Sequence, residues 1–399
     1  MTPEEQKKLA FDSRAVYYAP EAASQSLNAP IYMSSSFQYD ADSYQRVVDG
    51  ERKAVNIYGR CGNPSEYQFE EQMMQIHSAD ACLATASGMA AITVALFGLL
   101  KSGDHIVCDW TTYSSTHEML DHRWTDYGIT TTFVDTADVD AVAAAIQENT
   151  KVLYIEAIAN PSMKVAAIPP LVELAHKHDI VVICDNTFAS PYVLRPLEFG
   201  VDLVVESATK FIGGHNDALG GAIMLKAGLL PADFMETIRW NTMVKMGSPL
   251  SPFNAWLLLR GIQTLHVRVQ RQCENAMTLA QHLEQHPKVG RVWYPGLESH
   301  PQHHIAKEQM PKFGAMLTFE VTDADAALVV LDNLKLASFA ASLGSVRTTT
   351  QIPATMAFLD IPPEQRVRMG VSNGMIRVSA GLEDATDLIA DFNQALAQI

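Results

Sequence analysis

Short apolar runs alternate with amphipathic segments between about residues 66 and 230. The runs are rich in valine and isoleucine, and several are apolar on both faces, which is typical of strands in a buried parallel sheet. Amphipathic segments such as 138–148 and 171–178 predict helices between them. Strands are predicted at 105–109, 130–135, 152–157, 180–185, 203–207 and 221–225. This region therefore predicts an open α/β sheet, in which ligands bind beyond the carboxyl ends of the strands.

The pattern differs on either side of this region. Residues 1–60 are polar and weakly periodic, and they predict an extended arm. Residues 253–285 predict one long helix or a bent pair of helices. Strands predicted at 315–321, 337–340 and 375–379, with a helix at 385–398, indicate a second α/β unit. We therefore expect an arm at 1–60, a first domain at 61–255 and a second domain at 256–399.

Composition and charge exclude several classes of protein. The 399 residues suit two domains, and the net charge of −16 disfavours nucleic acid and anionic membrane surfaces as partners. The apolar run 90–100 is too short to cross a membrane, and residues 1–9 lack the apolar core of a secretory signal, so we expect a cytoplasmic location. Five cysteines without a C-x-x-C pair argue against a disulfide framework or a zinc site, and we expect no metal.

Three segments carry candidate chemistry. Asp185 ends a predicted strand, where it is either functional or a helix cap. Lys210 follows the next strand; a lysine beside a crevice can be desolvated, which lowers the pKa of its amine and frees it to form a Schiff base, although such lysines are usually solvated. The segment from Thr85 to Ala90 precedes a helix, where backbone N–H groups can bind an anion or Ser87 can simply cap the helix.

Taken together, these segments suit pyridoxal 5′-phosphate (PLP). A phosphorylated pyridine aldehyde needs an amine for its aldehyde, a carboxylate for its ring nitrogen and a cradle for its phosphate. The hydroxyls of Ser207 and Thr209, which precede Lys210, can join the backbone N–H groups on that phosphate. The sequence therefore predicts a PLP enzyme that acts on a small amino-acid substrate.

The sequence resembles the Cys/Met-metabolism family of PLP enzymes over nearly the whole chain. That family includes cystathionine γ-synthase, cystathionine β- and γ-lyases, methionine γ-lyase and O-acyl-homoserine sulfhydrylases. The resemblance implies a type I PLP-transferase fold, similar to aspartate aminotransferase, with a large doubly wound, mainly parallel sheet domain and a smaller C-terminal α/β domain. The matching motifs are Tyr58-Gly59-Arg60-Cys61-Gly62-Asn63-Pro64, Ala86-Ser87-Gly88-Met89, Asn160-Pro161, Asp185-Asn186-Thr187-Phe188, Ser207-Ala208-Thr209-Lys210, Leu250-Ser251-Pro252-Phe253, Leu257-Leu258-Leu259-Arg260-Gly261, Tyr294-Pro295-Gly296-Leu297, Ser342-Leu343-Gly344 and Arg377-Val378-Ser379-Ala380-Gly381-Leu382-Glu383-Asp384.

The resemblance also implies a role for each matched residue. Lys210 carries the cofactor and moves protons, Asp185 pairs with the pyridine nitrogen, and Tyr113 stacks on the ring and acts as an acid or base. Arg377, assisted by Ser342, binds the substrate carboxylate. The other implied cofactor contacts are Ser87, Gly88, Met89, Ser207 and Thr209 at the phosphate, Asn160 at the ring hydroxyl oxygen, and Tyr58 and Arg60 from a neighbouring subunit. The shared site implies a homo-oligomer, namely a catalytic dimer that pairs into a tetramer.

Three positions depart from the family pattern near the side-chain end of the substrate. Ser115 stands where methionine γ-lyases often carry a cysteine. Ile352 stands where a histidine often precedes the Pro-Ala pair. Arg347 stands where an acidic residue is common; it either pairs with an acidic residue or faces solvent, or it binds substrate and favours a polar or anionic γ-group.

We expect α,γ-elimination on an amino acid whose γ-leaving group is a thiol or a non-thioether group such as a halide or acyloxy group. The alternatives are γ-replacement on an O-acyl-homoserine and β-elimination of cystathionine. Ser207-x-x-Lys210 also matches the S-x-x-K motif of serine acyl-enzymes, but the K-T-G motif that accompanies it is absent. A non-catalytic binding protein on the same fold is another alternative, which the presence of both Lys210 and Asp185 disfavours.

Overall fold

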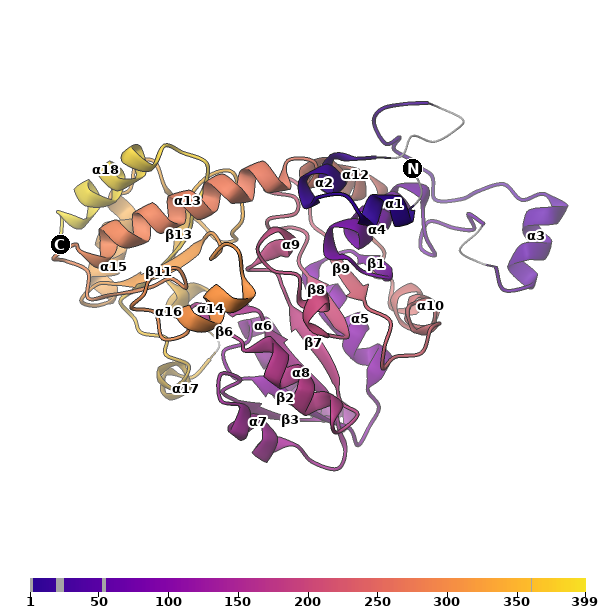
Figure 1. The fold of residues 1–399 in the computed structure, drawn as a ribbon, viewed down its shortest axis with the longest axis horizontal. Coiled ribbons are helices and arrows are strands. Elements are labelled where there is room, and N and C mark those ends of the chain that lie inside the picture. The colour runs from indigo at the N-terminus through magenta and orange to yellow at the C-terminus, as the bar shows by residue number, and fades with distance from the viewer. Residues whose placement is uncertain (1–2, 19–24, 52–54, 360) are drawn as a thin grey trace.

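A seven-stranded sheet forms the centre of the first domain in the computed structural model, which describes residues 3–18, 25–51, 55–359 and 361–399 (Figure 1). The strand order is β1-β9-β8-β7-β4-β2-β3, and only β9 runs antiparallel to its neighbours. The strands are β1 (Ala81–Thr85), β2 (His105–Asp109), β3 (Thr130–Val134), β4 (Thr150–Glu156), β7 (Val181–Asp185), β8 (Leu203–Glu206) and β9 (Gly221–Leu225). Six of these were predicted; β1 was missed because its Ala-Cys-Leu-Ala-Thr sequence has few β-branched residues and leads into an apolar helix.

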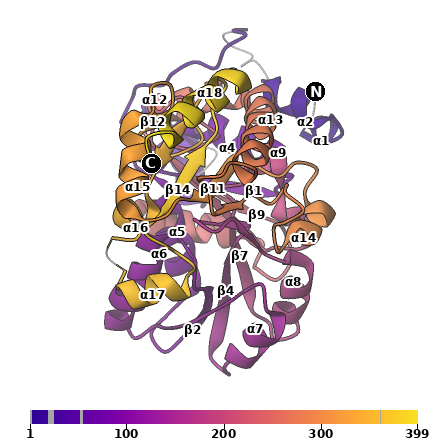
Figure 2. The ribbon, with the colours of Figure 1, turned by 90° about the vertical axis from the view of Figure 1, so that its left-hand side faces the viewer.

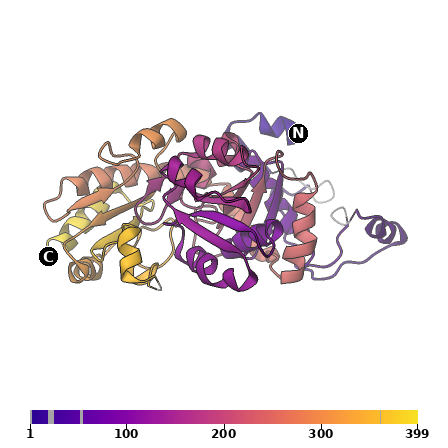
Figure 3. The same cartoon turned by 90° about the horizontal axis from the view of Figure 1, so that it is seen from below.

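Helices cover both faces of this sheet (Figure 3). Successive residues of β7 point to opposite faces, so Val182 and Cys184 join one apolar cluster while Ile183 joins another. The first cluster contains side chains of α4 (Pro64–His77), α7 (Val139–Ala145), α8 (Ile168–His176) and α12 (Pro252–Ile262); the second contains side chains of α5 (Gly88–Leu99) and α10 (Phe234–Ile238). Burial on both faces explains why these strands are apolar throughout.

A five-stranded sheet in the order β10-β11-β14-β13-β12 forms the second domain. Figure 2 shows β11 and β14 above β4 and β7 of the first domain. The strands are β10 (Arg291–Trp293), β11 (Met316–Glu320), β12 (Ser338–Phe339), β13 (Thr349–Gln351) and β14 (Met375–Ser379), and the main helices are α13 (Leu265–Glu284), α15 (Ala324–Asn333) and α18 (Ala385–Leu396). Residues 253–285 form the bent pair α12 and α13. Leu258 and Ile262 of α12 lie in the hydrophobic core of the first domain, so the chain leaves that core after residue 255.

The N-terminal region has two parts. The helices α1 (Pro3–Lys7) and α2 (Phe11–Val16) lie against the first domain, where Arg14 Nη1 donates to the Gln75 carbonyl at 2.8 Å. By contrast, α3 (Ala41–Val48) buries no residue and projects from the rest of the chain (Figure 1). Within the described ranges, no helix is long and apolar enough to span a bilayer.

Candidate active site

Lys210 lies in the turn that follows β8, at the carboxyl edge of the parallel strands. Its Nζ donates to Ser342 Oγ at 2.8 Å. Burial, together with the positive charge of Arg377, lowers the pKa of Lys210 to about 8. The side chain therefore has a far larger share of free amine near neutral pH than an ordinary lysine, which is the form that attacks an aldehyde.

Asp185 ends β7 one strand away. Its Oδ1 accepts the Thr187 N–H at 2.9 Å, and its Oδ2 accepts the Tyr154 hydroxyl at 3.4 Å. Burial raises the pKa of Asp185, and no positively charged side chain in the described part of the chain offsets this effect. A buried carboxyl without a counter-charge fits a protonated ring nitrogen.

Glu156 ends β4 directly beside Asp185 in the strand register. Its Oε1 accepts the backbone N–H of Tyr113 at 2.6 Å, which holds the residue that precedes α6 (Ser114–Glu118). Burial and the neighbouring Asp185 raise the pKa of Glu156 well above its usual range. Tyr113 itself is 42% exposed in this chain.

The N-terminus of α5 meets the turn that carries Ser207. Ser87 caps this helix by accepting the Ala90 N–H at 3.1 Å. A Cβ on Gly88 would lie 2.7 Å from the Ser207 Cβ, so only glycine permits this approach. Thr209 Oγ1 contacts both the Gly220 carbonyl at 3.2 Å and the Gly220 N–H at 3.0 Å. The first-turn N–H groups of α5, including that of Met89, and the Ser207 hydroxyl therefore form a surface that suits a phosphate.

Arg377 projects from β14 and is only 5% exposed. Its Nη1 donates to Asn160 Oδ1 at 3.2 Å, and its Nη2 donates to the Ser342 carbonyl at 3.0 Å. Burial lowers the pKa of this guanidinium, but an arginine keeps its charge in proteins. Because no carboxylate among the described residues pairs with it, the cost of burying this charge favours an incoming anion.

Ser342 joins the lysine and the arginine. Its hydroxyl accepts from Lys210 and its carbonyl accepts from Arg377. Its φ of 80° is in the left-handed region, which is unusual for serine and recurs at functional sites. The structure therefore brings together Lys210, Asp185, Tyr113, Asn160, Ser342 and Arg377, and beside them the α5 terminus with Ser87, Gly88, Met89, Ser207 and Thr209.

Three predicted site residues lie on the surface of this chain instead. Tyr58 is 45% exposed, and the Arg60 guanidinium lies 5.9 Å from the centre of its ring. Arg60 also donates to the Val244 carbonyl at 2.7 Å. Arg347 is exposed and donates to Ser338 Oγ at 3.0 Å. Within the described ranges, no hydrogen bond links these side chains to Lys210 or Arg377.

Sequence reasoning missed two residues of the site. Glu156 could have been found as an acidic residue at the end of an otherwise apolar strand, the same signal that identified Asp185. Gln351 pairs with Arg377 across β13 and β14, so the two side chains share a face. The Gln351 Nε2 is buried and has no hydrogen-bond partner among the described residues. This amide could not be identified from sequence, because the pairing of the two strands brings it to the site.

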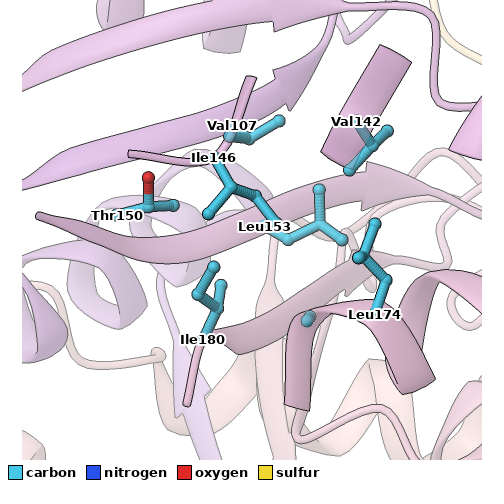
Figure 4. Close-up of a pocket in the computed structure, with 8 residues that line it drawn as sticks. Val107, Val142, Ile146, Thr150, Leu153, Leu174 and Ile180 are labelled. Atoms are coloured by element: carbon cyan, nitrogen blue, oxygen red, sulfur yellow. The ribbon is translucent and has the colours of Figure 1, made fainter. Parts of the chain in front are cut away.

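An apolar gap lies elsewhere in the first domain, between the sheet and the helices α7 and α8 (Figure 4). Val107 and Leu153 from the sheet face Val142 and Leu174 from the helices. The single hydroxyl on its lining, that of Thr150, is bonded to His105. This gap is a feature of core packing and offers no group for the chemistry described above.

The fold and the site define a PLP-dependent enzyme. A model of the family described as "Cys/Met metabolism PLP-dependent enzyme" matches residues 14–397, and the chain belongs to this family. The chain is 42% identical to the L-methionine γ-lyase of Fusobacterium nucleatum subsp. polymorphum over 94% of each protein, and 36% identical to the cystathionine β-lyase of Coxiella burnetii over 99% of this chain and 100% of that one. Its structure matches that of cystathionine γ-lyase from Lactobacillus plantarum complexed with L-serine, with a TM-score of 0.91, 35% identity and coverage of 98% and 99%.

These matches confirm the predicted family, the type I fold and PLP as the cofactor, and they identify the chain as a lyase of Cys/Met metabolism. The site residues fit that cofactor. Lys210 supplies a free amine for the aldehyde, and Asp185 supplies for the ring nitrogen a carboxyl that no positive side chain among the described residues offsets. The close approach of Gly88 to Ser207 leaves a surface for the phosphate.

Proposed function

We propose that the protein catalyses α,γ-elimination on an amino acid that carries a leaving group at Cγ. The observation that carries this proposal is the position of Ser342. Its hydroxyl lies 2.8 Å from the Lys210 amine, and its carbonyl lies 3.0 Å from the Arg377 guanidinium. An amino acid whose carboxylate binds Arg377 has its Cα within reach of the lysine. Relatives named methionine γ-lyase and cystathionine γ-lyase, at 38–42% identity, support this choice of reaction.

Each site residue of this chain has a separate role in the proposed reaction. PLP, when bound, withdraws electrons from the substrate and so acidifies its Cα and Cβ protons. Arg377, assisted by Ser342, holds the carboxylate. Asn160 contacts the ring hydroxyl oxygen, and Asp185 keeps the ring nitrogen protonated. The Lys210 amine, whose pKa of about 8 lies near physiological pH, accepts the Cα proton and passes a proton onward. Tyr113 lies at the open side of the site, where its hydroxyl protonates the departing group.

The catalytic unit in this proposal is a homodimer, which pairs into a tetramer. Tyr58 and Arg60 are exposed and lie at the end of the N-terminal segment that includes α3. Large apolar side chains of the same segment are also exposed, such as Leu27 at 87% and Met33 at 74%, which supports contact with another subunit. In the dimer, Tyr58 and Arg60 reach the phosphate site of the partner.

Product analysis tests the reaction. The PLP-loaded enzyme is incubated separately with methionine, cystathionine, O-acetylhomoserine and a γ-chloro amino acid, and the products are identified by mass spectrometry. Elimination at Cγ yields 2-oxobutanoate and ammonia, and Lys210→Ala should abolish both. Pyruvate from cystathionine would indicate β-elimination instead, and a new thioether formed when a thiol is added would indicate γ-replacement.

The same substrates test the role of Arg347 at the distal end of the substrate. If its guanidinium contacts polar γ-groups, Arg347→Glu should change the preference between polar and thioether substrates by about 1–3 kcal/mol. Equal losses of kcat/KM for every substrate would contradict a role in specificity. The hydrogen bond of Arg347 to Ser338 would then account for the residue.

A further inference from the structure

The helix α13 is shared by the two domains. Leu265, Val269 and Cys273 in its first half lie in the core of the first domain. Leu279 and Leu283 in its second half lie in the core of the second domain. Neighbouring side chains on one face of this helix can therefore contact loops of both domains from one rigid support.

Arg268 lies near the start of α13 and is only 3% exposed. Its guanidinium donates to the Phe211 carbonyl at 2.8 Å and to the Ile212 carbonyl at 3.2 Å. Further bonds reach the Gly261 carbonyl at 2.8 Å and Thr264 Oγ1 at 3.1 Å. All of these acceptors are neutral, and burial lowers the pKa of Arg268 to about 10. A buried charge that is held only by neutral oxygens is costly, so the arrangement is not explained by ion pairing.

Phe211 and Ile212 belong to the turn that carries Lys210. The turn continues through Gly214, whose N–H donates to the Lys210 carbonyl at 2.8 Å. Gly214 has a φ of +72°, and a Cβ there would overlap the Arg268 guanidinium. The guanidinium thus occupies the space beside the turn and fixes two of its carbonyls.

Gln272 lies one turn further along the same face of α13. It is fully buried, and its Nε2 donates to the Ser345 carbonyl at 2.7 Å. Ser345 belongs to the loop that begins with Ser342, the residue that joins Lys210 and Arg377. The two loops also contact each other directly, since the Val346 N–H donates to the Gly214 carbonyl at 2.9 Å.

We propose that Arg268 and Gln272 are positioning residues that set the spacing between the Lys210 turn and the Ser342 loop. One turn of helix separates the two side chains by about 5–6 Å. Because each side chain is hydrogen-bonded to one of the loops, the helix holds the two loops at a constant separation. The carboxylate of the substrate is bound from the second domain, while the proton-accepting amine belongs to the first. Their relative placement therefore depends on α13; the link to turnover rests on the function proposed above.

The test compares PLP-loaded Arg268→Met with Arg268→Lys, Gln272→Leu and the control Arg271→Met. Arg271 lies on the exposed side of α13, and its nearest acidic atom is Asp384 Oδ2 at 3.8 Å. The first readout is amide hydrogen exchange at Gly213 and Gly214. The second is the pH midpoint of the visible absorption of the lysine-bound cofactor. Neither readout requires a substrate.

In Arg268→Met, we expect the amide hydrogens of Gly213 and Gly214 to exchange at least about tenfold faster, because the carbonyls of their turn are no longer held by the guanidinium. The absorption midpoint should move by at least about half a pH unit, and kcat should fall by about 10²-fold with little change in KM. Arg268→Lys should show the same changes, because one ammonium cannot replace a fork that bonds several carbonyls. Gln272→Leu should speed exchange at Val346, and Arg271→Met should change none of these properties.

Unchanged exchange and an unchanged midpoint in folded Arg268→Met would overturn the proposal, and so would a loss of kcat without either change. If Arg268→Met does not fold, Arg268→Lys and Gln272→Leu decide by the same criteria. Altered exchange and absorption in a protein that turns over none of the tested substrates would leave the positioning role intact and reject the proposed reaction.

Discussion

Replacing Lys210 by methionine should stabilise the cofactor-free protein at neutral pH. The pKa of Lys210 is lowered from 10.5 to about 8, mainly by burial. At about 1.4 kcal/mol per pH unit, the charged amine costs the folded state about 3 kcal/mol at pH 7. The hydrogen bond that Lys210 donates to Ser342 returns about 1 kcal/mol, so the expected net gain in Lys210→Met is about 2 kcal/mol.

The sign of the pH dependence follows from proton binding. Because the folded pKa is lower, the unfolded chain binds more protons between pH 8 and 10.5, and the wild-type protein gains stability as the pH rises through this range. The cost remaining at pH 9.5 is about 1.4 kcal/mol, so the advantage of Lys210→Met should shrink by about 2 kcal/mol between pH 7 and 9.5. The lost hydrogen bond contributes equally at both values.

Urea unfolding of the cofactor-free proteins at pH 7, 8 and 9.5 measures this difference. Lys307→Met, which makes the same change at an exposed position on α14 (His303–Gln309), is the matched control. A stability difference for Lys210→Met that does not vary with pH would refute the argument. It would show that the amine is either solvated or balanced by a charge.

Two further predictions concern other parts of the molecule. Mixing inactive Arg60→Ala chains with inactive Lys210→Ala chains should restore about a quarter of wild-type activity, since half of the dimers are hybrids with one intact site; no recovery after verified subunit exchange would contradict a shared site. Arg239→Met should lower the free energy of unfolding by about 3–5 kcal/mol, because Arg239 pairs at 3.1 Å with Glu66 and at 2.5 Å with Glu70 in the core. A loss below about 1 kcal/mol in urea unfolding would show that these carboxyl groups are neutral or otherwise compensated.

The sequence alone determined most of the first domain and the nature of its chemistry. Strands of a buried parallel sheet are apolar on both faces, so β2, β3, β4, β7, β8 and β9 could be recognised from local composition. The positions of Asp185 at the end of a strand and of Lys210 in the turn after the next strand are also local properties. Because parallel strands bring their carboxyl ends to one edge, these positions were enough to predict a PLP site.

The sequence could not determine which residues meet across the site. Glu156 lies beside Asp185 through strand register, and Gln351 lies beside Arg377 through the pairing of β13 with β14. The short strands β10 and β13 were also missed, since segments of three residues carry too little periodicity and exist through their partners.

The tertiary structure also decided the electrostatics of the site. Ser342 meets Lys210 across 132 residues of sequence, and Arg377 meets Asn160 across 217. The lowered pKa of Lys210 arises from burial by segments of both domains and from the charge of Arg377. Sequence sets which groups can titrate or donate, but desolvation and charge interactions depend on distances between remote segments, and only packing fixes those distances.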